Sequence, residues 1–360
     1  MIKNLLTFVI AFAGFVNLSA QEKKFKVHTV AFYNVENFYD TINDPKTRDD
    51  EWVYTPKNFK KKVSNIAKVI SLIGTDENPN SPTIVGLAEI ENKSILEALA
   101  KDPQLIAKDY GYVHFDSPDK RGIDNGFLYQ KKHFVVTSAI NVPLMIYEDY
   151  HTTDSKTKVE ANDKEDRPEV DPNTGRIYTR DQLLVSGLLD GEEIHFIVNH
   201  WPSRRGGEAA SSPLREQAAA LNMKIIDSLY KINPNAKVIT MGDLNDGPYN
   251  KSVKKVLGAK AKREDVKPFG MFNPMEELFN KGNGTLAYRD AWDLFDQMIM
   301  TEPLTRKDYS TFCFWKAGVF KRSYLFQTSG QYKGYPNRNW NGEIGYSDHL
   351  PVYLYLIKQM

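Results

Sequence analysis

Residues 183–198 read LLVSGLLDGEEIHFIV, two apolar runs joined by Asp190-Gly191, and this stretch sets the class of fold. Both runs are rich in large aliphatic and β-branched residues, which favours β-strands. Asp-Gly between two such runs is a strong signal for a two-residue hairpin. The sequence therefore predicts a sheet that is at least partly antiparallel, and a purely doubly wound parallel fold is disfavoured.

Outward from the hairpin, further short apolar runs predict strands at 27–35, 83–90, 126–129, 237–241 and 352–357. Helix-period stretches lie between some of them, at 57–73, 94–100 and 214–230. The last is expected to begin with Ser212 as N-cap and Pro213 in the first turn. The charged run 148–180 and the segment 258–288 lack periodicity and are predicted as loops inserted into one core. The architecture is mixed α and β.

Polar residues with catalytic potential recur where these strands end. The segments are Tyr33-Asn34-Val35-Glu36-Asn37, Leu87-Ala88-Glu89, Asn199-His200-Trp201-Pro202-Ser203, Gly242-Asp243-Leu244-Asn245 and, just before the last strand, Ser347-Asp348-His349. Because apolar strands lead into carboxylates, amides and histidines each time, we expect these residues to share one edge of the fold.

Oxygen and amide ligands without cysteine suit a hard cation, Mg²⁺, Mn²⁺ or Ca²⁺, better than structural zinc. A cation of that kind clamps phosphate oxygens. Taken alone, Asp243-Leu244-Asn245 has a simpler interpretation as an Asx turn, and His200 as a structural histidine. The occurrence of all the segments together favours the functional interpretation.

In this order, and spread over residues 32–351, the segments resemble the endonuclease/exonuclease/phosphatase superfamily. That group includes DNase I-like nucleases, abasic-site exonucleases, inositol-polyphosphate phosphatases and bacterial sphingomyelinases. The resemblance implies an α+β fold, a four-layered α/β/β/α sandwich of two mixed β-sheets flanked by helices. This fold then needs only a single domain, at residues 21–360, which follows a signal peptide at residues 1–20. It also implies a metal-dependent phosphoric ester hydrolase that uses Mg²⁺ or Mn²⁺, with Ca²⁺ as the alternative.

By motif position, the resemblance implies that Glu89 is the principal metal carboxylate, with Asn34 and Asp348 near the metal. Asn34 is also expected to stabilise the charge that develops on the phosphate. Asp243 and Asn245 are expected to contact the phosphate or its nucleophilic water.

His349 resembles the base that activates water in this family, and such a histidine needs a carboxylate that fixes its tautomer. Asp296, just before an apolar stretch, fits that position best, and Asp293 is the alternative. His200 occupies the position of the general acid found in DNase I-like and sphingomyelinase-like members. Asp124 is the predicted orienting acid for His200, with a structural turn as the alternative. The implied reaction is in-line displacement at phosphorus without a covalent intermediate.

The N-terminus and the composition limit location and partners. Lys3, an apolar run at 5–16 and Ser19-Ala20 form the pattern of a secretory signal peptide, with an uncleaved anchor as the alternative. Cys313 is the only cysteine, which excludes an intrachain disulfide. Lys and Arg number 47 against 46 Asp and Glu, so a whole-molecule basic field for nucleic acid is absent. We expect a periplasmic or extracellular protein without a transmembrane segment in its mature form, in which anion binding is local.

The sequence leaves the substrate open. Arg204 and Arg205 follow the His200 segment, where two guanidiniums can grip a neighbouring phosphate of a nucleic acid; a solvated basic turn is the alternative. The run 312–346 mixes aromatic residues with cations, which can stack bases, dip into lipid or pack as a loop. A nuclease acting on DNA or RNA is favoured. The alternative is a phosphomonoesterase or sphingomyelinase-like head-group hydrolase, and an inactive binding module is disfavoured because no expected catalytic position is missing. No obligate protein partner is indicated.

Overall fold

Two mixed β-sheets form the centre of the computed structural model, which describes residues 24–49, 54–147, 170–340 and 342–360. The first sheet contains β1 (Phe25–Phe38), β2 (Ile84–Ile90), β3 (Tyr110–His114), β4 (Asp124–Gln130), β15 (Cys313–Val319) and β16 (Val352–Gln359). The second contains β5 (Phe134–Val142), β8 (Gln182–Leu189), β9 (Glu192–His200), β10 (Val238–Asp243), β11 (Met271–Phe272) and β14 (Asp296–Thr301). Their orders are β15-β16-β1-β2-β4-β3 and β11-β14-β10-β9-β8-β5. The pairs β1–β2 and β9–β10 are parallel, and the other pairs are antiparallel.

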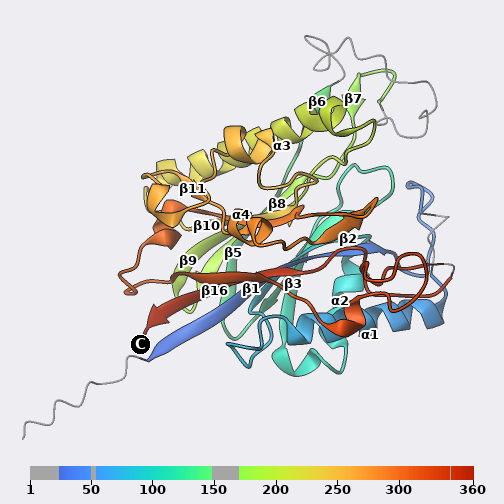
Figure 1. Ribbon diagram of the computed structural model, residues 1–360, viewed down its shortest axis with the longest axis horizontal. Helices are drawn as coiled ribbons and strands as arrows, with labels where there is room; N and C mark the ends of the chain where they lie inside the picture. Colours follow the sequence, from blue (N-terminus) through green and yellow to red (C-terminus); the bar gives the residue numbers. More distant parts are fainter. Residues whose placement is uncertain (1–23, 50–53, 148–169, 341) are drawn as a thin grey trace, which may run out of the picture.

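Helices cover the outer face of each sheet and complete four layers (Figure 1). On the first sheet lie α1 (Pro56–Leu72) and α2 (Lys93–Lys101), and on the second lies α3 (Glu208–Ile232). The described residues also form the short helix α4 (Met275–Asn280) and two small two-stranded sheets. One sheet pairs β6 (Ile146–Tyr147) with β7 (Arg176–Ile177), and the other pairs β12 (Leu286–Tyr288) with β13 (Ala291–Asp293). The predicted α/β/β/α sandwich of two mixed sheets is confirmed.

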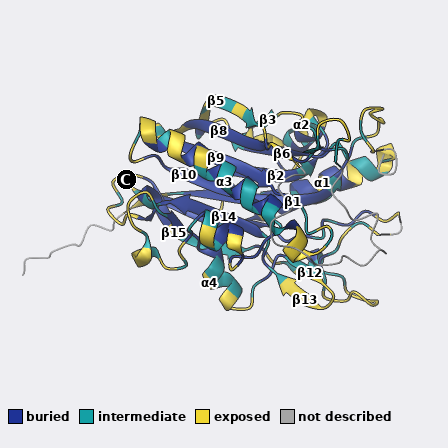
Figure 2. Cartoon of the chain, turned by 90° about the horizontal axis from the view of Figure 1, so that it is seen from above, coloured by how far each residue is buried: buried dark blue, intermediate teal, exposed yellow. Residues whose placement is uncertain are grey.

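Both faces of the central strands are buried, because each sheet packs against the other sheet on one side and against helices on the other. Along β1, Val30 and Phe32 enter the core between the sheets, whereas Ala31 and Tyr33 pack in the cluster formed with α1 and α2. Figure 2 shows buried residues filling the sheets and exposed residues on the outer sides of helices and loops. Burial on both faces explains why these strands appear in the sequence as nearly continuous apolar runs.

The hairpin predicted from Asp190-Gly191 is confirmed. β8 and β9 pair antiparallel from Leu183 opposite Val198 to Leu189 opposite Glu192. Asp190 has φ 44° and Gly191 has φ 87°. Two consecutive left-handed residues match the right-handed twist of the flanking strands.

The predicted start of the third helix is wrong. α3 begins at Glu208, so Pro213 lies inside the helix and Ser212 is not its N-cap. The residue before the helix is Gly207, with φ 97° and no capping side chain. Ser211 bonds back instead, because its hydroxyl donates to the carbonyl of Gly207 at 2.7 Å. Glu208 in the first turn also complements the helix dipole.

Some predicted loops contain regular structure. The segment 258–288 includes β11 and α4, and the run 312–346 includes β15. The predicted signal peptide at 1–20 and most of the charged run 148–180 lie outside the described residues. Within the ranges that the structure describes, no helix combines the length and apolar character needed to cross a bilayer.

Candidate active site

The ends of strands from both sheets bring the predicted residues together at one edge. Asn34 on β1 donates from Nδ2 to Oδ2 of Asp243, the last residue of β10, at 3.0 Å. The same nitrogen lies 3.4 Å from Oε1 of Glu89 on β2. Nε2 of His200 and Nε2 of His349 each lie 3.7 Å from Asp243 Oδ2. Asp243 therefore lies at the centre of a group that also contains Asn34, Glu89, His200 and His349.

Irregular backbone aims Asn34 and Glu89 at this centre. The β1–β2 pairing shifts after Asn34, and the β2–β4 pairing skips Glu89. Glu89 has φ 65° and Glu36 has φ 54°, both in the left-handed region. Bulges re-aim side chains, and strained conformations of this kind are characteristic of functional sites. The backbone N–H of Asn37 fixes the Glu89 carboxylate by donating to Oε2 at 2.7 Å.

Asn34 presents its amide nitrogen, and not its oxygen, to the carboxylates. Its Oδ1 accepts a hydrogen bond from the backbone N–H of Glu36 at 3.0 Å, while its backbone carbonyl accepts one from the hydroxyl of Ser347 at 2.7 Å. In this arrangement Asn34 acts as a donor. Direct ligation of a cation through Oδ1 requires the amide to turn over.

Asp296 is the carboxylate beside His349. It is fully buried, and its Oδ2 lies 2.7 Å from Nδ1 of His349. The alternative, Asp293, instead accepts a hydrogen bond from the hydroxyl of Tyr249 at 2.7 Å. The predicted pairing is thus present and involves Asp296. Although burial acts to lower it, the negative charges of Asp296 and Asp243 raise the pKa of His349 well above its usual value.

His200 does not have the orienting acid predicted for it. Its buried Nδ1 has no hydrogen-bond partner in the described part of the chain. Asp124 accepts a hydrogen bond from the backbone N–H of Ser117 at 2.8 Å and pairs with Nε2 of His114 at 3.1 Å. The assignment of Asp124 to His200 is therefore wrong. The reason is local, because β3 lies directly beside β4 and presents His114 to the start of that strand.

Two arginines that sequence reasoning missed, the buried Arg180 and the partly buried Arg121, lie on the His200 side of the site. Arg180 donates from Nε to the backbone carbonyl of His200 at 3.2 Å and from Nη1 to Asp119 Oδ2 at 3.1 Å. Arg121 reaches Oδ1 of Asn37 at 3.5 Å. Burial, assisted by the positive charges of Arg180 and Arg121, lowers the pKa of His200 well below its usual value. No motif marks either arginine, so only the folded chain reveals them.

Crowded carboxylates make the centre suitable for a cation. Burial raises the pKa of Asp243 to about 6, and the charges of Asp296 and Glu89 act in the same direction against that of His349. A nearby positive charge would stabilise the ionised forms. Carboxylate and amide oxygens are the donors that Mg²⁺ and related hard cations prefer. The residues present therefore fit a divalent cation held mainly by Glu89 and Asp243.

Asp348, the third predicted metal residue, stands beside Arg338. Nη2 of Arg338 lies 3.5 Å from Asp348 Oδ2, and its Nε donates to Glu36 Oε1 at 3.0 Å. Burial raises the pKa of Glu36 to about 7, and the charge of Asp348 adds to this effect. Glu36 was missed as a site residue although it belongs to the same strand-end segment as Asn34. Asp348 thus contributes negative charge to the site while ion-paired with Arg338.

The guanidinium of Arg204 is bonded within the protein, an arrangement that the prediction of a phosphate-binding group did not include. Its Nε donates to the backbone carbonyl of Asn245 at 2.9 Å, and its Nη2 donates to Asn250 Oδ1 at 3.1 Å. The guanidinium also lies 4.3 Å from the centroid of the Phe295 ring. These contacts hold the loop that follows β10. Arg205 is exposed and lines a pocket described below.

Asn245 positions Asp243. Its backbone N–H donates to Asp243 Oδ1 at 2.9 Å, and its side-chain amide donates to the carbonyl of Trp201 at 3.0 Å. With φ 50°, it turns the chain immediately after β10. Contact of Asn245 with phosphate stays a prediction.

Two pockets lie next to residues of the site, although neither is lined by His200 or His349. A small pocket of about 60 Å³ is lined by Arg180, which donates to the His200 carbonyl, and also by Arg48, Lys120, Arg121, Arg205 and the carboxylate of Asp119. A larger one of about 410 Å³ adjoins Asp348, and its walls include Tyr288, Tyr332, Tyr335, Arg338 and Trp340. The first pocket is therefore mainly basic, and the second is rich in aromatic side chains.

Comparison with known proteins identifies related sequences and structures. A family model described as Endonuclease/Exonuclease/phosphatase family matches residues 29–167 and 140–358. An endonuclease/exonuclease/phosphatase family protein from Bacteroides thetaiotaomicron has 16% identity and a TM-score of 0.53, covering 94% of this chain and 97% of that chain. A humanized TDP2 from D. rerio has 13% identity and a TM-score of 0.52, covering 92% and 98%.

A mannosyl-6-phosphatase, also from Bacteroides thetaiotaomicron, has 16% identity and a TM-score of 0.50, covering 91% of this chain and 99% of that chain. At these identities the structures establish likeness of fold alone. No curated protein sequence matches the chain.

Proposed function

The chain belongs to the Endonuclease/Exonuclease/phosphatase family, whose members are phosphoester hydrolases that generally depend on a divalent metal, and on that premise we propose that it is a nuclease. The proposed reaction is hydrolysis of phosphodiester bonds in DNA or RNA by in-line attack of water.

The observation that carries this proposal is a pair of pockets next to the site, one lined by Arg180, which donates to the His200 carbonyl, and the other by Asp348, which precedes His349. A phosphodiester continues on both sides of its phosphorus, so it needs room in two directions. The basic pocket suits a neighbouring phosphate, since guanidiniums bind phosphate oxygens in pairs. The aromatic pocket suits a base, because bases stack on aromatic side chains. A phosphomonoester uses only one of the two.

Proton transfer in the proposed mechanism involves both histidines. Asp296 holds Nδ1 of His349 and leaves Nε2 directed at the carboxylate centre, where it can take a proton from the attacking water. His200, beside the basic pocket, gives a proton to the departing oxygen. Asn34, as a donor close to Asp243, is positioned to stabilise negative charge on the phosphate.

Glu89 and Asp243, with Asp348 and Asn34 nearby, would hold the divalent cation, Mg²⁺ or Mn²⁺, with Ca²⁺ as the alternative. When bound, the cation supplies positive charge that offsets charge developing on the phosphate oxygens. The buried carboxylates and the raised pKa of Asp243 support this arrangement.

The test compares Arg205→Ala and Trp340→Ala with the wild type on single-stranded DNA, RNA and a small nitrophenyl phosphodiester. Arg205→Ala should reduce the slope of log affinity for single-stranded DNA against log salt by about 0.7, because one phosphate contact is lost. Trp340→Ala should weaken nucleic-acid binding by about 1–3 kcal/mol, the value typical of one stacked base. Hydrolysis of the small diester should hardly change in either variant.

Lys307→Ala serves as the matched control, since Lys307 is an exposed cation outside both pockets. It should leave the salt slope unchanged. If Arg205→Ala and Trp340→Ala behave like this control on nucleic acid, while mannose 6-phosphate or sphingomyelin is the better substrate, the nuclease proposal fails. The phosphomonoesterase or head-group hydrolase would then replace it.

A further inference from the structure

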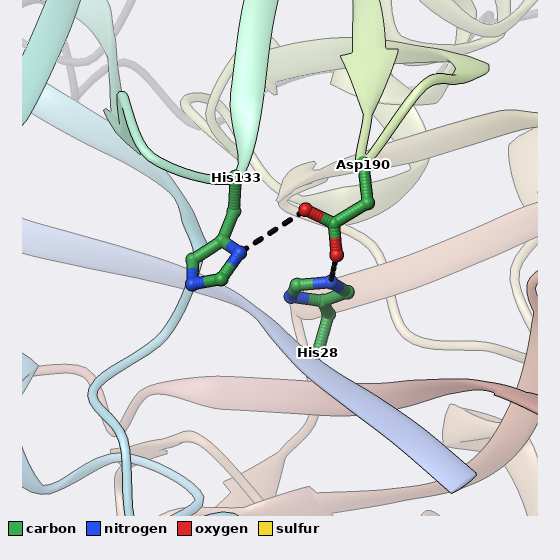
Figure 3. Close-up of side chains that lie close together, drawn as sticks. All are labelled: His28, His133 and Asp190. Atoms are coloured by element: carbon green, nitrogen blue, oxygen red, sulfur yellow. Dashed lines mark hydrogen bonds and ion pairs between the residues drawn. The ribbon is translucent and has the colours of Figure 1, made fainter. Parts of the chain in front are cut away.

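The opposite end of the two sheets carries a second group of ligand-type side chains (Figure 3). His28 lies near the start of β1, His133 lies in the link between β4 and β5, and Asp190 forms the β8–β9 turn. One nitrogen from each imidazole and a carboxylate oxygen all lie within 4.8 Å of one another. Because His28 belongs to the first sheet and Asp190 adjoins the second, the group spans both.

The Asp190 carboxylate lies between the two imidazoles. Its Oδ2 is 2.7 Å from Nε2 of His28, and its Oδ1 is 3.1 Å from Nδ1 of His133. The centroids of the two rings are 5.1 Å apart. Ligand atoms of a tetrahedral zinc ion, with bonds of about 2.0–2.1 Å, lie roughly 3.3 Å from one another. Shifts of about an ångström or less in these side chains would therefore admit an ion among the three atoms.

His28 is held in a ligating orientation by its surroundings. Its Nδ1 is 2.8 Å from the hydroxyl of Thr83, and its ring packs edge-on against Phe312 with centroids 5.2 Å apart. A hydrogen bond to the second ring nitrogen fixes tautomer and orientation in metal-ligating histidines. Burial lowers the pKa of His28, which favours the neutral imidazole that binds metals.

Asp190 supplies the negative charge. Against the effect of burial, hydrogen bonds from Lys26 and His28 lower the pKa of Asp190 to about 2. Nζ of Lys26 lies 2.9 Å from Asp190 Oδ2, and the Lys26 side chain is 44% exposed. Lys26 therefore competes with any metal ion for this carboxylate, and it can turn into solvent when an ion binds.

We propose that His28, His133 and Asp190 bind a divalent transition-metal ion of the zinc class, with water completing the coordination. Two imidazoles and a carboxylate form a donor set suited to zinc. On binding, the ion takes the ring nitrogens that now face Asp190, and each neutral imidazole carries its proton on its other ring nitrogen. In His28 that nitrogen is Nδ1, which then donates to the hydroxyl of Thr83.

The ion would stabilise the fold and would not take part in the proposed phosphoester chemistry. It would join β1, the β4–β5 link and the β8–β9 turn, and hence both sheets. His28 and Asn34 lie on the same strand, six residues apart, which corresponds to about 20 Å. Zinc binding here is therefore separable from occupancy of the candidate active site, and the inference does not rest on the proposed function.

The test uses zinc titration calorimetry and thermal unfolding of the whole chain in excess Mg²⁺. His133→Ala, at a partly exposed position, should bind one zinc ion fewer than the wild type. A zinc concentration of 100 times Kd should raise the wild-type Tm by roughly 4 °C and should not raise that of the variant through this site. Lys26→Met, which removes the competing ammonium, should tighten zinc binding, a gain that misfolding cannot mimic.

A matched control comes from the other close group of potential ligands in the described ranges, His114, Asp116 and Asp124. Asp116→Asn should bind zinc as the wild type does. Equal zinc stoichiometry in the wild type and His133→Ala overturns the assignment. The assignment is also overturned if Asp116→Asn alone loses a zinc ion, or if the zinc affinity of Lys26→Met equals that of the wild type.

Discussion

Replacing Asp296 by Asn isolates the carboxylate that orients His349. Asp296 is fully buried, with Oδ2 2.7 Å from Nδ1 of His349, and Nε2 of that ring lies 3.7 Å from Asp243. Asn has the same shape, but its amide N–H can donate to Nδ1. That contact favours the tautomer with the proton on Nε2, which cannot take a proton from water.

The expected loss follows from the size of the step that is removed. General-base catalysis contributes about 10²–10⁴-fold, so kcat should fall by at least about 10²-fold. This corresponds to about 2.7 kcal/mol of transition-state stabilisation. The substitution also removes a negative charge that raises the pKa of His349, so the remaining acidic limb of the pH–rate profile should move to lower pH.

Steady-state hydrolysis of a nitrophenyl phosphodiester with saturating Mg²⁺ measures the effect, and Tm reports whether the variant is folded. Asp293→Asn is the matched control, because Asp293 is bonded to Tyr249 and not to a histidine. It should retain kcat. A folded Asp296→Asn variant with the kcat and pH profile of the wild type would refute the assignment of His349 as base.

Two further results are expected at the same site. Excess chelator should abolish turnover, and Mg²⁺ or Mn²⁺ should restore it, because the carboxylates around Asp243 need a positive charge; full activity in chelator would contradict this. His200→Ala should lower turnover of an alkyl phosphodiester by at least ~10²-fold but largely spare a nitrophenolate ester, whose leaving group needs no proton. Equal loss on both esters would make His200 a structural or phosphate-binding residue.

The parts of the fold that could be predicted from the sequence are those buried on both faces. β1, β2 and β9 appear as apolar runs because sheet and helix cover them on opposite sides. β5 was missed, since it is a sheet edge and most of its residues are partly or fully exposed. Its sequence FVVTSAINV has six apolar residues of nine, but Thr137, Ser138 and Asn141 interrupt the apolar run. The start of α3 was misplaced because Pro213 was taken as a first-turn signal.

The sequence locates the candidate site residues along the chain, but it does not always identify the side chains that each of them contacts. Asp124 does lie at the strand edge where it was expected, yet its partners are Ser117 and His114. Arg204 follows His200 as required, yet its guanidinium is bonded to the loop after β10. A strand end fixes the position of a backbone, whereas the contacts of a side chain depend on neighbours that are distant in sequence. His349 and Asp296 could be paired because a family resemblance supplied that relation.

In the absence of substrate and cation, the pKa values of His200 and His349 are shifted in opposite directions. Burial and nearby arginines lower the pKa of His200, and acidic neighbours raise that of His349. An acid must carry a proton and a base must lack one, so these two pKa shifts oppose the roles proposed for His200 and His349. A phosphate anion beside His200 raises its pKa, and a cation at Glu89 and Asp243 lowers that of His349. Substrate and cation together therefore shift the pKa values of His200 and His349 toward their proposed roles.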